Sequence, residues 1–255
     1  MANVYGGKGE TDKALEYYNK SLAVQRNNLG ESHPSMAASY NNMANVYHSV
    51  SEHDKALEYF NKALTIQLNT RGEHHQGVAT SYSNMVSVYS EKGELDKALE
   101  YCHEALTIQL NTVGDNHPDV AISYSNMADV YSGKGELDNA LAYYNQSLTI
   151  RLKTFGKNHP NVATSYNNMA GAYSSNGELD KALEYYHKSL VIRLKTIGEN
   201  HKSVIISYIN IANVYCGKGV KSLTISLNTL GENHPNVADT YGGMANVYYN
   251  SRWSY

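Results

Sequence analysis

Histidines that recur at a nearly constant spacing are the first candidates for chemistry in this chain of 255 residues. They are His33, His75, His117, His159, His201 and His234. Imidazole nitrogens bind zinc, but a zinc site needs several ligands around one ion. Each of these histidines belongs to a different connector, and no second ligand recurs beside it. We therefore expect no metal site from them and predict that each marks the start of a helix.

Carboxylates recur as well, and their position indicates a structural use. They are Asp54, Asp96, Asp138 and Asp180. Each is predicted in the first turn of a helix, where a negative charge is stabilised by the positive end of the helix. The sequence shows no nucleophile with a base beside it, and no glycine-rich phosphate loop after a strand. We therefore expect no catalytic activity and no cofactor.

The third recurring set consists of amides on one predicted helix face: Asn42, Asn84, Asn126, Asn168 and Asn210. Three residues further on, the same face carries Asn45, Ser87, Asp129, Gly171 and Asn213, so the two rows form a polar stripe. An amide donates and accepts hydrogen bonds, which suits the backbone of an extended peptide. The predicted peptide-binding residues are Asn42, Asn45, Asn84, Asn126, Asp129, Asn168, Asn210 and Asn213. The alternative is that these asparagines brace neighbouring helices.

These residues recur because the chain repeats itself every 42 residues, as the positions of Met1, Met43, Met85, Met127 and Met169 show. In the copy at 34–75, apolar or aromatic residues follow Pro34 at helical spacing. A tight turn, a second and longer helical pattern, and Gly72 come next. We name the two elements helix A and helix B, and we expect a left-handed conformation at the glycine. Helix A is predicted at 34–49, 76–91, 118–133, 160–175 and 203–217.

The spacing Tyr40-x2-Met43-Ala44-x2-Tyr47 followed by Ala56-x3-Phe60 resembles the tetratricopeptide (TPR) signature, and it recurs from Tyr124 and from Tyr166. The longer period and the Leu-Gly-Glu-Asn-His-Pro connector look like the repeats of kinesin light chains. This resemblance implies an all-α, right-handed α-solenoid. A unit this short cannot close its own core, so its copies must stack.

The spacing predicts one TPR array over residues 1–255. It comprises a partial repeat 1 (1–33), repeats 2–5 (34–201), a shortened repeat 6 (202–234) and a terminal helix A (235–255). The array starts inside a helix A and ends without a helix B. We expect either that the chain is part of a longer protein or that the last helix serves as a lid.

Composition and charge restrict the class of protein. Cys102 takes the place of a Tyr or Phe in other copies and is expected to be a buried thiol, and with only Cys216 besides, no disulfide framework is implied. No apolar run could span a bilayer and no signal-like start is present, so we expect a cytoplasmic protein without membrane contact. A pI of about 6.4 argues against nucleic acid. The cations Arg151, Lys153, Lys157, Arg193 and Lys195 suit the negative ends of helices B.

The resemblance implies a protein-interaction scaffold whose helices A line a concave groove, where asparagines commonly hold peptide backbone. TPR proteins that bind a terminal carboxylate, and kinesin light chains that bind acidic motifs, use basic residues there. The predicted helices A contain no Lys or Arg, and Asp129 and Asp239 are the expected groove charges. We therefore expect a peptide or a helical partner in this groove, with a ligand that is neutral or mildly basic. The alternatives are a regulatory arm of a larger multidomain enzyme, a kinesin-light-chain-like cargo adaptor, and a structural spacer.

The sixth repeat should be the weakest part of the array. Ile211 and Met244 lie only 33 residues apart, because nine residues of helix B, including one Leu and two Tyr, are absent. Burying those side chains would contribute roughly 5 kcal/mol. Native-state hydrogen exchange should therefore show weaker amide protection at 216–222 than in the helices B of repeats 2–5. Equal protection would contradict this prediction.

Overall fold

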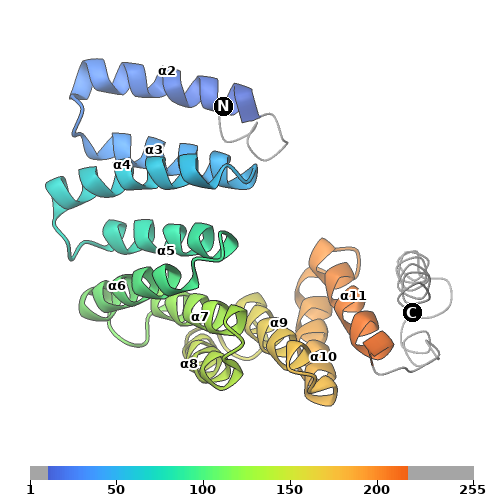
Figure 1. Ribbon diagram of the computed structural model, residues 1–255. Helices are drawn as coiled ribbons and strands as arrows, with labels where there is room; N and C mark the ends of the chain where they lie inside the picture. The colour runs from blue at the N-terminus through green and yellow to red at the C-terminus, as the bar shows by residue number, and fades with distance from the viewer. Residues whose placement is uncertain (1–10, 218–255) are drawn as a thin grey trace. The chain divides into compact units, whose positions relative to one another are not determined.

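The computed structural model describes residues 11–217, which fold into ten α-helices (Figure 1). The shorter helices A have 16 residues: α3 (Pro34–Ser49), α5 (Gln76–Glu91), α7 (Pro118–Gly133), α9 (Pro160–Ser175) and α11 (Lys202–Gly217). The longer helices B have 19: α2 (Thr11–Leu29), α4 (His53–Arg71), α6 (Leu95–Val113), α8 (Leu137–Phe155) and α10 (Leu179–Ile197). No helix among the residues described is long and apolar enough to cross a membrane.

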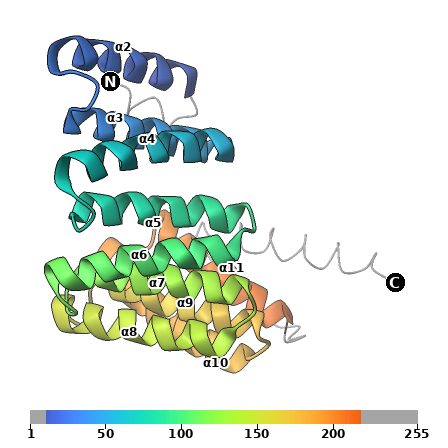
Figure 2. The same ribbon diagram turned by 60° about the vertical axis from the view of Figure 1, so that its left-hand side comes forward.

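The chain divides into two compact units, Met1–Gly135 and Glu136–Tyr255. In the first unit, each helix from α2 to α7 packs on the next one in the chain, as the successive layers in Figures 1 and 2 show. In the second unit, α8 packs on α9, α9 on α10 and α10 on α11. The predicted all-α fold of consecutive helix pairs, a TPR-like α-solenoid, is confirmed.

The predicted helices A agree with the structure, except that α11 begins one residue earlier, at Lys202. The single array over 1–255 stays a prediction. Residues 235–255, with Asp239, lie outside the described residues, as do 218–234 of the shortened repeat and most of the predicted weak segment at 216–222.

The core is built from the same few positions in every repeat. The recurring methionines Met43, Met85, Met127 and Met169 are at most 1% exposed, and the small residue that opens the helix B face, such as Ala56 or Ala98, is 0% exposed. A small side chain there lets the backbones of the two helices approach each other, and the unbranched Met fills the space that remains. The prediction for Cys102 is confirmed: it is 1% exposed, and burial raises the pKa of its thiol to about 12.

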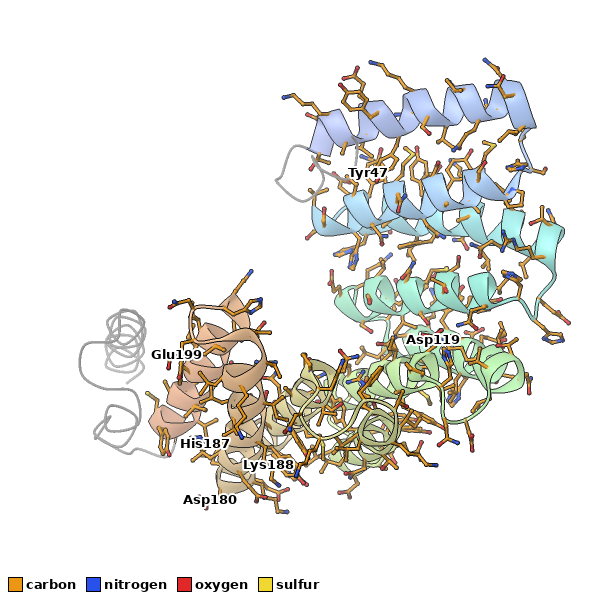
Figure 3. The ribbon with its side chains drawn as sticks, turned by 180° about the vertical axis from the view of Figure 1, so that it is seen from behind. Tyr47, Asp119, Asp180, His187, Lys188 and Glu199 are labelled. Atoms are coloured by element: carbon orange, nitrogen blue, oxygen red, sulfur yellow. The ribbon has the colours of Figure 1, made fainter. Side chains whose placement is uncertain are left out.

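Stacked tyrosine rings join helix A to helix B in repeats 2, 3 and 5. In repeat 2, the ring of Tyr47 stacks on that of Tyr59 with centroids 5.3 Å apart, and the Lys62 ammonium lies 4.5 Å from the Tyr59 centroid (Tyr47 is labelled in Figure 3). Tyr89 and Tyr101 repeat the stack at 5.2 Å. These half-buried rings pack on one side, and stacking with a cation nearby adds attraction beyond burial.

The glycines that end helices B adopt a different conformation from the one predicted. Gly72 has φ 83° and ψ 164°, and Gly114, Gly156 and Gly198 follow it closely. The positive φ was expected, but ψ lies far from the left-handed helical value. The prediction of a left-handed helical cap was therefore wrong. The chain leaves helix B extended, in a region that is essentially open only to glycine, because the connector must run to the next helix A.

The turn between helix A and helix B provides a second positive φ. Gly93 in repeat 3 has φ 76°, whereas the equivalent residue of repeat 2 is Ser51, with φ 60°. A side chain at positive φ costs about 1 kcal/mol. Repeat 2 therefore forms the same turn with backbone strain that its neighbours avoid.

Exchanging these two residue types tests the strain. Ser51→Gly should stabilise the protein and Gly93→Ser should destabilise it, each by about 0.5–1 kcal/mol, since nothing lies within 4 Å of a Cβ built at Gly93. Urea denaturation curves measure both changes. A Gly93→Ser variant as stable as the parent would show that the turn is not strained.

Candidate functional site

The predicted stripe lies on the solvent side of helix A in both units. Asn42, Asn84, Asn126, Asn168 and Asn210 are half-buried. Asn45, Asp129 and Asn213 are exposed, and the stripe also includes the exposed residues Ala38, Thr80, Ile122, Thr164 and Ile206, one turn before each half-buried asparagine. The helical spacing places these residues as expected on α3, α5 and α7 of the first unit and on α9 and α11 of the second.

The amides of the stripe differ in what they contact. The side chains of Asn42, Asn84, Asn126 and Asn168 make no hydrogen bond to another group in residues 11–217. In contrast, Asn210 Nδ2 on α11 donates to Asn167 Oδ1 on α9, at 3.4 Å. Bracing between helices is therefore observed for one of the five amides, and the other four keep their donors and acceptors available to a ligand or to water.

Apolar side chains stand among these amides. Ile122 is 48% exposed on α7, and Ile206 and Ile209 are 40% and 45% exposed on α11. No Lys or Arg lies on α3, α5, α7 or α9. The stripe therefore offers hydrogen-bonding amides, scattered apolar contacts and the exposed carboxylate of Asp129, without a cation on these four helices.

A buried polar pair sets the register that positions each stripe. In the first unit, Ser39, Ser81 and Ser123 of helices A donate from Oγ to Oε1 of Gln25, Gln67 and Gln109 of the preceding helices B, at 2.7 to 3.1 Å. In the second unit the partners are arginines: Arg151 donates to Ser165 Oγ and Arg193 to Ser207 Oγ, both at 2.7 Å. Sequence reasoning missed this pair. Its signal was a serine that recurs 14 residues after a Gln or Arg.

The hydrogen bonds of Arg151 and Arg193 to serine show that the predicted role of these two arginines was wrong. Arg151 and Arg193 were expected to lie among cations at the ends of helices B, but they are only 8% and 9% exposed. Burial lowers the pKa of Arg193 from its usual value. Its Nη1 also donates to the carbonyl of Ser203 at 3.0 Å, so the buried charge is hydrogen-bonded. Two of the five cations are therefore structural.

The recurring histidines of the described residues cap the helices A, as predicted, while His234 lies outside residues 11–217. The backbone N–H of Ser35 donates to His33 Nδ1 at 3.2 Å, and Gly77, Asp119, Asn161 and Ser203 make the same contact to His75, His117, His159 and His201 at 2.9 to 3.2 Å. Each imidazole thus satisfies an N–H in the first turn, where the helix has no partner for it. The accepting nitrogen carries no proton.

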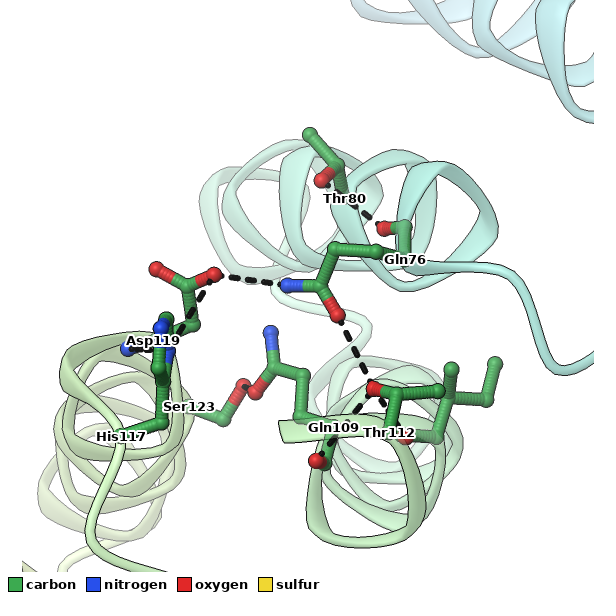
Figure 4. Close-up of polar contacts among 8 residues, drawn as sticks. Gln76, Thr80, Gln109, Thr112, His117, Asp119 and Ser123 are labelled. Carbon is green, nitrogen blue, oxygen red and sulfur yellow. Dashed lines mark hydrogen bonds and ion pairs between the residues drawn. The ribbon is translucent and has the colours of Figure 1, made fainter. Parts of the chain in front are cut away.

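One junction in the first unit has a further network (Figure 4). Gln76 Nε2 on α5 donates to Asp119 Oδ2 on α7 at 2.7 Å, and Thr112 Oγ1 on α6 donates to Gln76 Oε1 at 3.3 Å. Gln76 stands where α3, α7 and α9 have proline. Neighbouring helices A of this unit are therefore joined directly by side chains.

The recurring aspartates begin helices B, as expected, and two of them also form ion pairs between repeats. Asp54 lies in the first turn of α4 and accepts a hydrogen bond from Lys92 Nζ at 2.7 Å. Asp96 in α6 and Lys134 repeat the contact at 2.9 Å. Both carboxylates are exposed, so each pair contributes little to stability.

The tetratricopeptide-repeat family model matches residues 1–69, 77–153, 123–190 and 161–219, which cover most of the sequence. The chain belongs to the tetratricopeptide-repeat family. Stacked TPR units account for the alternating helices A and B and for the recurring buried Met and Ala positions. No curated protein sequence matches the chain significantly.

Solved TPR structures resemble the chain over most of its length. Nearly identical TPR-like repeats from Podosopora anserina, described as a kinesin light chain, are 27% identical, with a TM-score of 0.63 over 77% of this chain and 93% of that one. BtubC (BKLC) from P. vanneervenii is 20% identical, with a TM-score of 0.68 over 83% and 84%. A signal-transduction ATPase with a TPR sensor from Pyrococcus horikoshii is 18% identical, with a TM-score of 0.69 over 98% of this chain and 38% of that one. The last two likenesses concern the fold alone.

Substitutions at Arg193 test the buried pair of the TPR stack. Arg193→Leu removes the donor to Ser207 Oγ and one of the donors to the Ser203 carbonyl, which also accepts from Ser207 Oγ, and should destabilise the protein by about 1–3 kcal/mol. Arg193→Gln introduces the residue type of the first unit and should cost about 1 kcal/mol. Lys195→Gln, at an exposed position on the same helix, is the control, and urea denaturation is the measurement. Equal midpoints for Arg193→Leu and Lys195→Gln would show that the pair is dispensable.

Proposed function

We propose that the chain is a non-catalytic scaffold that holds an extended peptide against its helices A. TPR domains generally act as protein-interaction scaffolds. The observation that carries the proposal here is the set of half-buried amides whose side chains make no hydrogen bond among residues 11–217: Asn42, Asn84, Asn126 and Asn168. An amide that is partly shielded from water gains more from a ligand hydrogen bond than a fully exposed one does. In each unit these amides would pair with peptide N–H and C=O groups; Asn45 and Asp129 would complete the surface of the first unit, and Asn210 and Asn213 that of the second.

The chemistry of the stripe favours a neutral or mildly basic peptide with apolar side chains. The carboxylate of Asp129 is exposed, and α3, α5, α7 and α9 carry no Lys or Arg to attract an acidic ligand. Ile122 in the first unit and Ile206 in the second offer apolar surface beside the amides. Backbone pairing would give affinity, while these isoleucines and Asp129 would select among sequences.

A cargo adaptor is the second candidate, because the chain is 27% identical to repeats described as a kinesin light chain. An adaptor would use the same stripe, so the two candidates differ in the partner rather than in the site. The absence of cations on four helices A argues against acidic motifs in either case. A regulatory arm of a larger enzyme stays a prediction, since the likeness to the ATPase sensor concerns the fold alone.

Selection from a displayed library of random peptides, followed by fluorescence anisotropy with labelled peptides, tests the proposal. The selected peptides should have a net charge of zero or above. The triple variant Asn42→Ala, Asn84→Ala, Asn126→Ala should weaken binding by at least about tenfold, since each lost hydrogen bond costs roughly 0.5–1.5 kcal/mol.

The matched control replaces Asn27, Asn69 and Asn111 by Ala. These are also three amides 42 residues apart, but they lie exposed near the ends of helices B. The control should bind like the parent protein. Equal loss in the two triple variants, or selection of acidic peptides, would contradict the proposal.

A further inference from the structure

Two histidines and a glutamate from three different helices meet in the first unit, away from the connector histidines. They are His48 near the end of α3, His53 at the start of α4 and Glu91 at the end of α5. One ligand atom from each residue lies within 4.8 Å of the other two. His48 Nε2 is 3.0 Å and His53 Nδ1 is 3.9 Å from the same oxygen, Glu91 Oε2.

Both ring nitrogens are buried and lack a hydrogen bond of good geometry to any group among residues 11–217. A buried nitrogen without a partner is costly. If it is unprotonated, its lone pair also faces the negative oxygen of Glu91. A cation placed among the three atoms would satisfy all of them at once.

The three residues are also departures from the repeat. At the position of His48 the later repeats have Ser90, Ser132, Ser174 and Cys216, and at the position of His53 they have Leu95, Leu137 and Leu179. At the position of Glu91 the other helices A have Ser49, Gly133, Ser175 and Gly217. Each of these three ligand residues thus occurs in one repeat among those compared, and the three lie together in the structure.

The register of the stack explains why they meet. At the equivalent junction of the next two repeats, a Cβ built on Gly133 lies 3.7 Å from Leu95 Cδ1, so these two positions are neighbours there as well. The ligands are held by helices, and the turn between His48 and His53 contains the strained Ser51, with φ 60°. The site therefore rests on the packed scaffold rather than on a long loop.

We propose that His48, His53 and Glu91 bind a divalent transition-metal ion, with Zn²⁺ as the best match to two imidazole nitrogens and one carboxylate oxygen. In a tetrahedral zinc site the ligand atoms lie about 3.3 Å apart, given bonds of about 2.0–2.1 Å. The observed separations of 3.0 and 3.9 Å bracket that value. The side chain of Glu91 is 53% exposed, which leaves a fourth position open to water. The ion would join α3, α4 and α5, and so link repeats 2 and 3.

Isothermal titration of the full chain with Zn²⁺ at neutral pH tests the site. We expect one Zn²⁺ per chain with a higher thermal unfolding midpoint in its presence, because a ligand that binds only the folded state stabilises it. The double variant His48→Ser, His53→Leu uses the residue types of the other repeats, so it should fold. It should bind this Zn²⁺ at least about tenfold more weakly and lose the shift in midpoint.

The control replaces two other histidines, His103 and His187, by Asn, the residue that repeats 2 and 4 carry at that position as Asn61 and Asn145. Both variants thus lose two imidazoles, and only the first removes ligands. The control should keep the single tight site and the shift in midpoint. Absence of saturable Zn²⁺ binding to the parent chain, or equal binding by the two double variants, would overturn the proposal.

Discussion

The structure depends on the fact that a helix pair of about 40 residues cannot bury both of its apolar faces by itself. Helix A and helix B close one interface between them, through Ala44, Ala56 and Phe60 in repeat 2. The remaining apolar face must be covered by the next repeat. Stability is therefore shared between neighbouring repeats. The polar residues that enter this interface include hydrogen-bonded pairs of Gln or Arg with Ser.

Helices A and B have different roles because each repeat must cover the apolar face of its neighbour. Helix B contributes the long side chains that reach the next repeat, while helix A leaves one face to solvent. That face carries the amide stripe, in which Asn42, Asn84, Asn126 and Asn168 make no side-chain hydrogen bond among residues 11–217, whereas Asn210 contacts Asn167 of α9. Half-buried Asn84 lies at the border of the two roles, one position before the buried Met85.

Much of this fold could be predicted from the sequence, because the patterns that indicate helices, helix caps and turns recur in several copies of the repeat. Helix A spans 34–49 as the pattern indicated, and the connector histidines cap helices as expected. The predicted conformation of the glycines was wrong because a positive φ does not determine ψ. The value of ψ at Gly72 is set by the path of the connector to the next helix. Arg151 was misplaced because a charge near a helix end satisfies the dipole argument whether it points outward or inward.

The two candidate sites differ in how far they could be predicted from the sequence. The stripe lies on one helix face, so spacing along the helix was enough to predict it. The group of His48, His53 and Glu91 joins three helices of two repeats, and its members stand at positions that repetition does not mark. Periodicity reports what the copies share. Contacts made by residues that differ between copies depend on the register between helices. That register is known only from the three-dimensional structure.

The serine hydroxyl at the repeat junctions has a consequence for how such an array can change. Ser81 donates a hydrogen bond to the side-chain oxygen of Gln67, whereas Ser165 accepts a hydrogen bond from Arg151, although the two serines occupy equivalent positions in their repeats. A hydroxyl can rotate, so a serine at this position can pair either with a hydrogen-bond acceptor or with a hydrogen-bond donor on the neighbouring helix. Repeats with Gln and repeats with Arg at this position can therefore be joined in a new order while the hydrogen bond at the junction is kept. Gene duplication or unequal recombination can then lengthen or shorten the array without further substitutions at the junction.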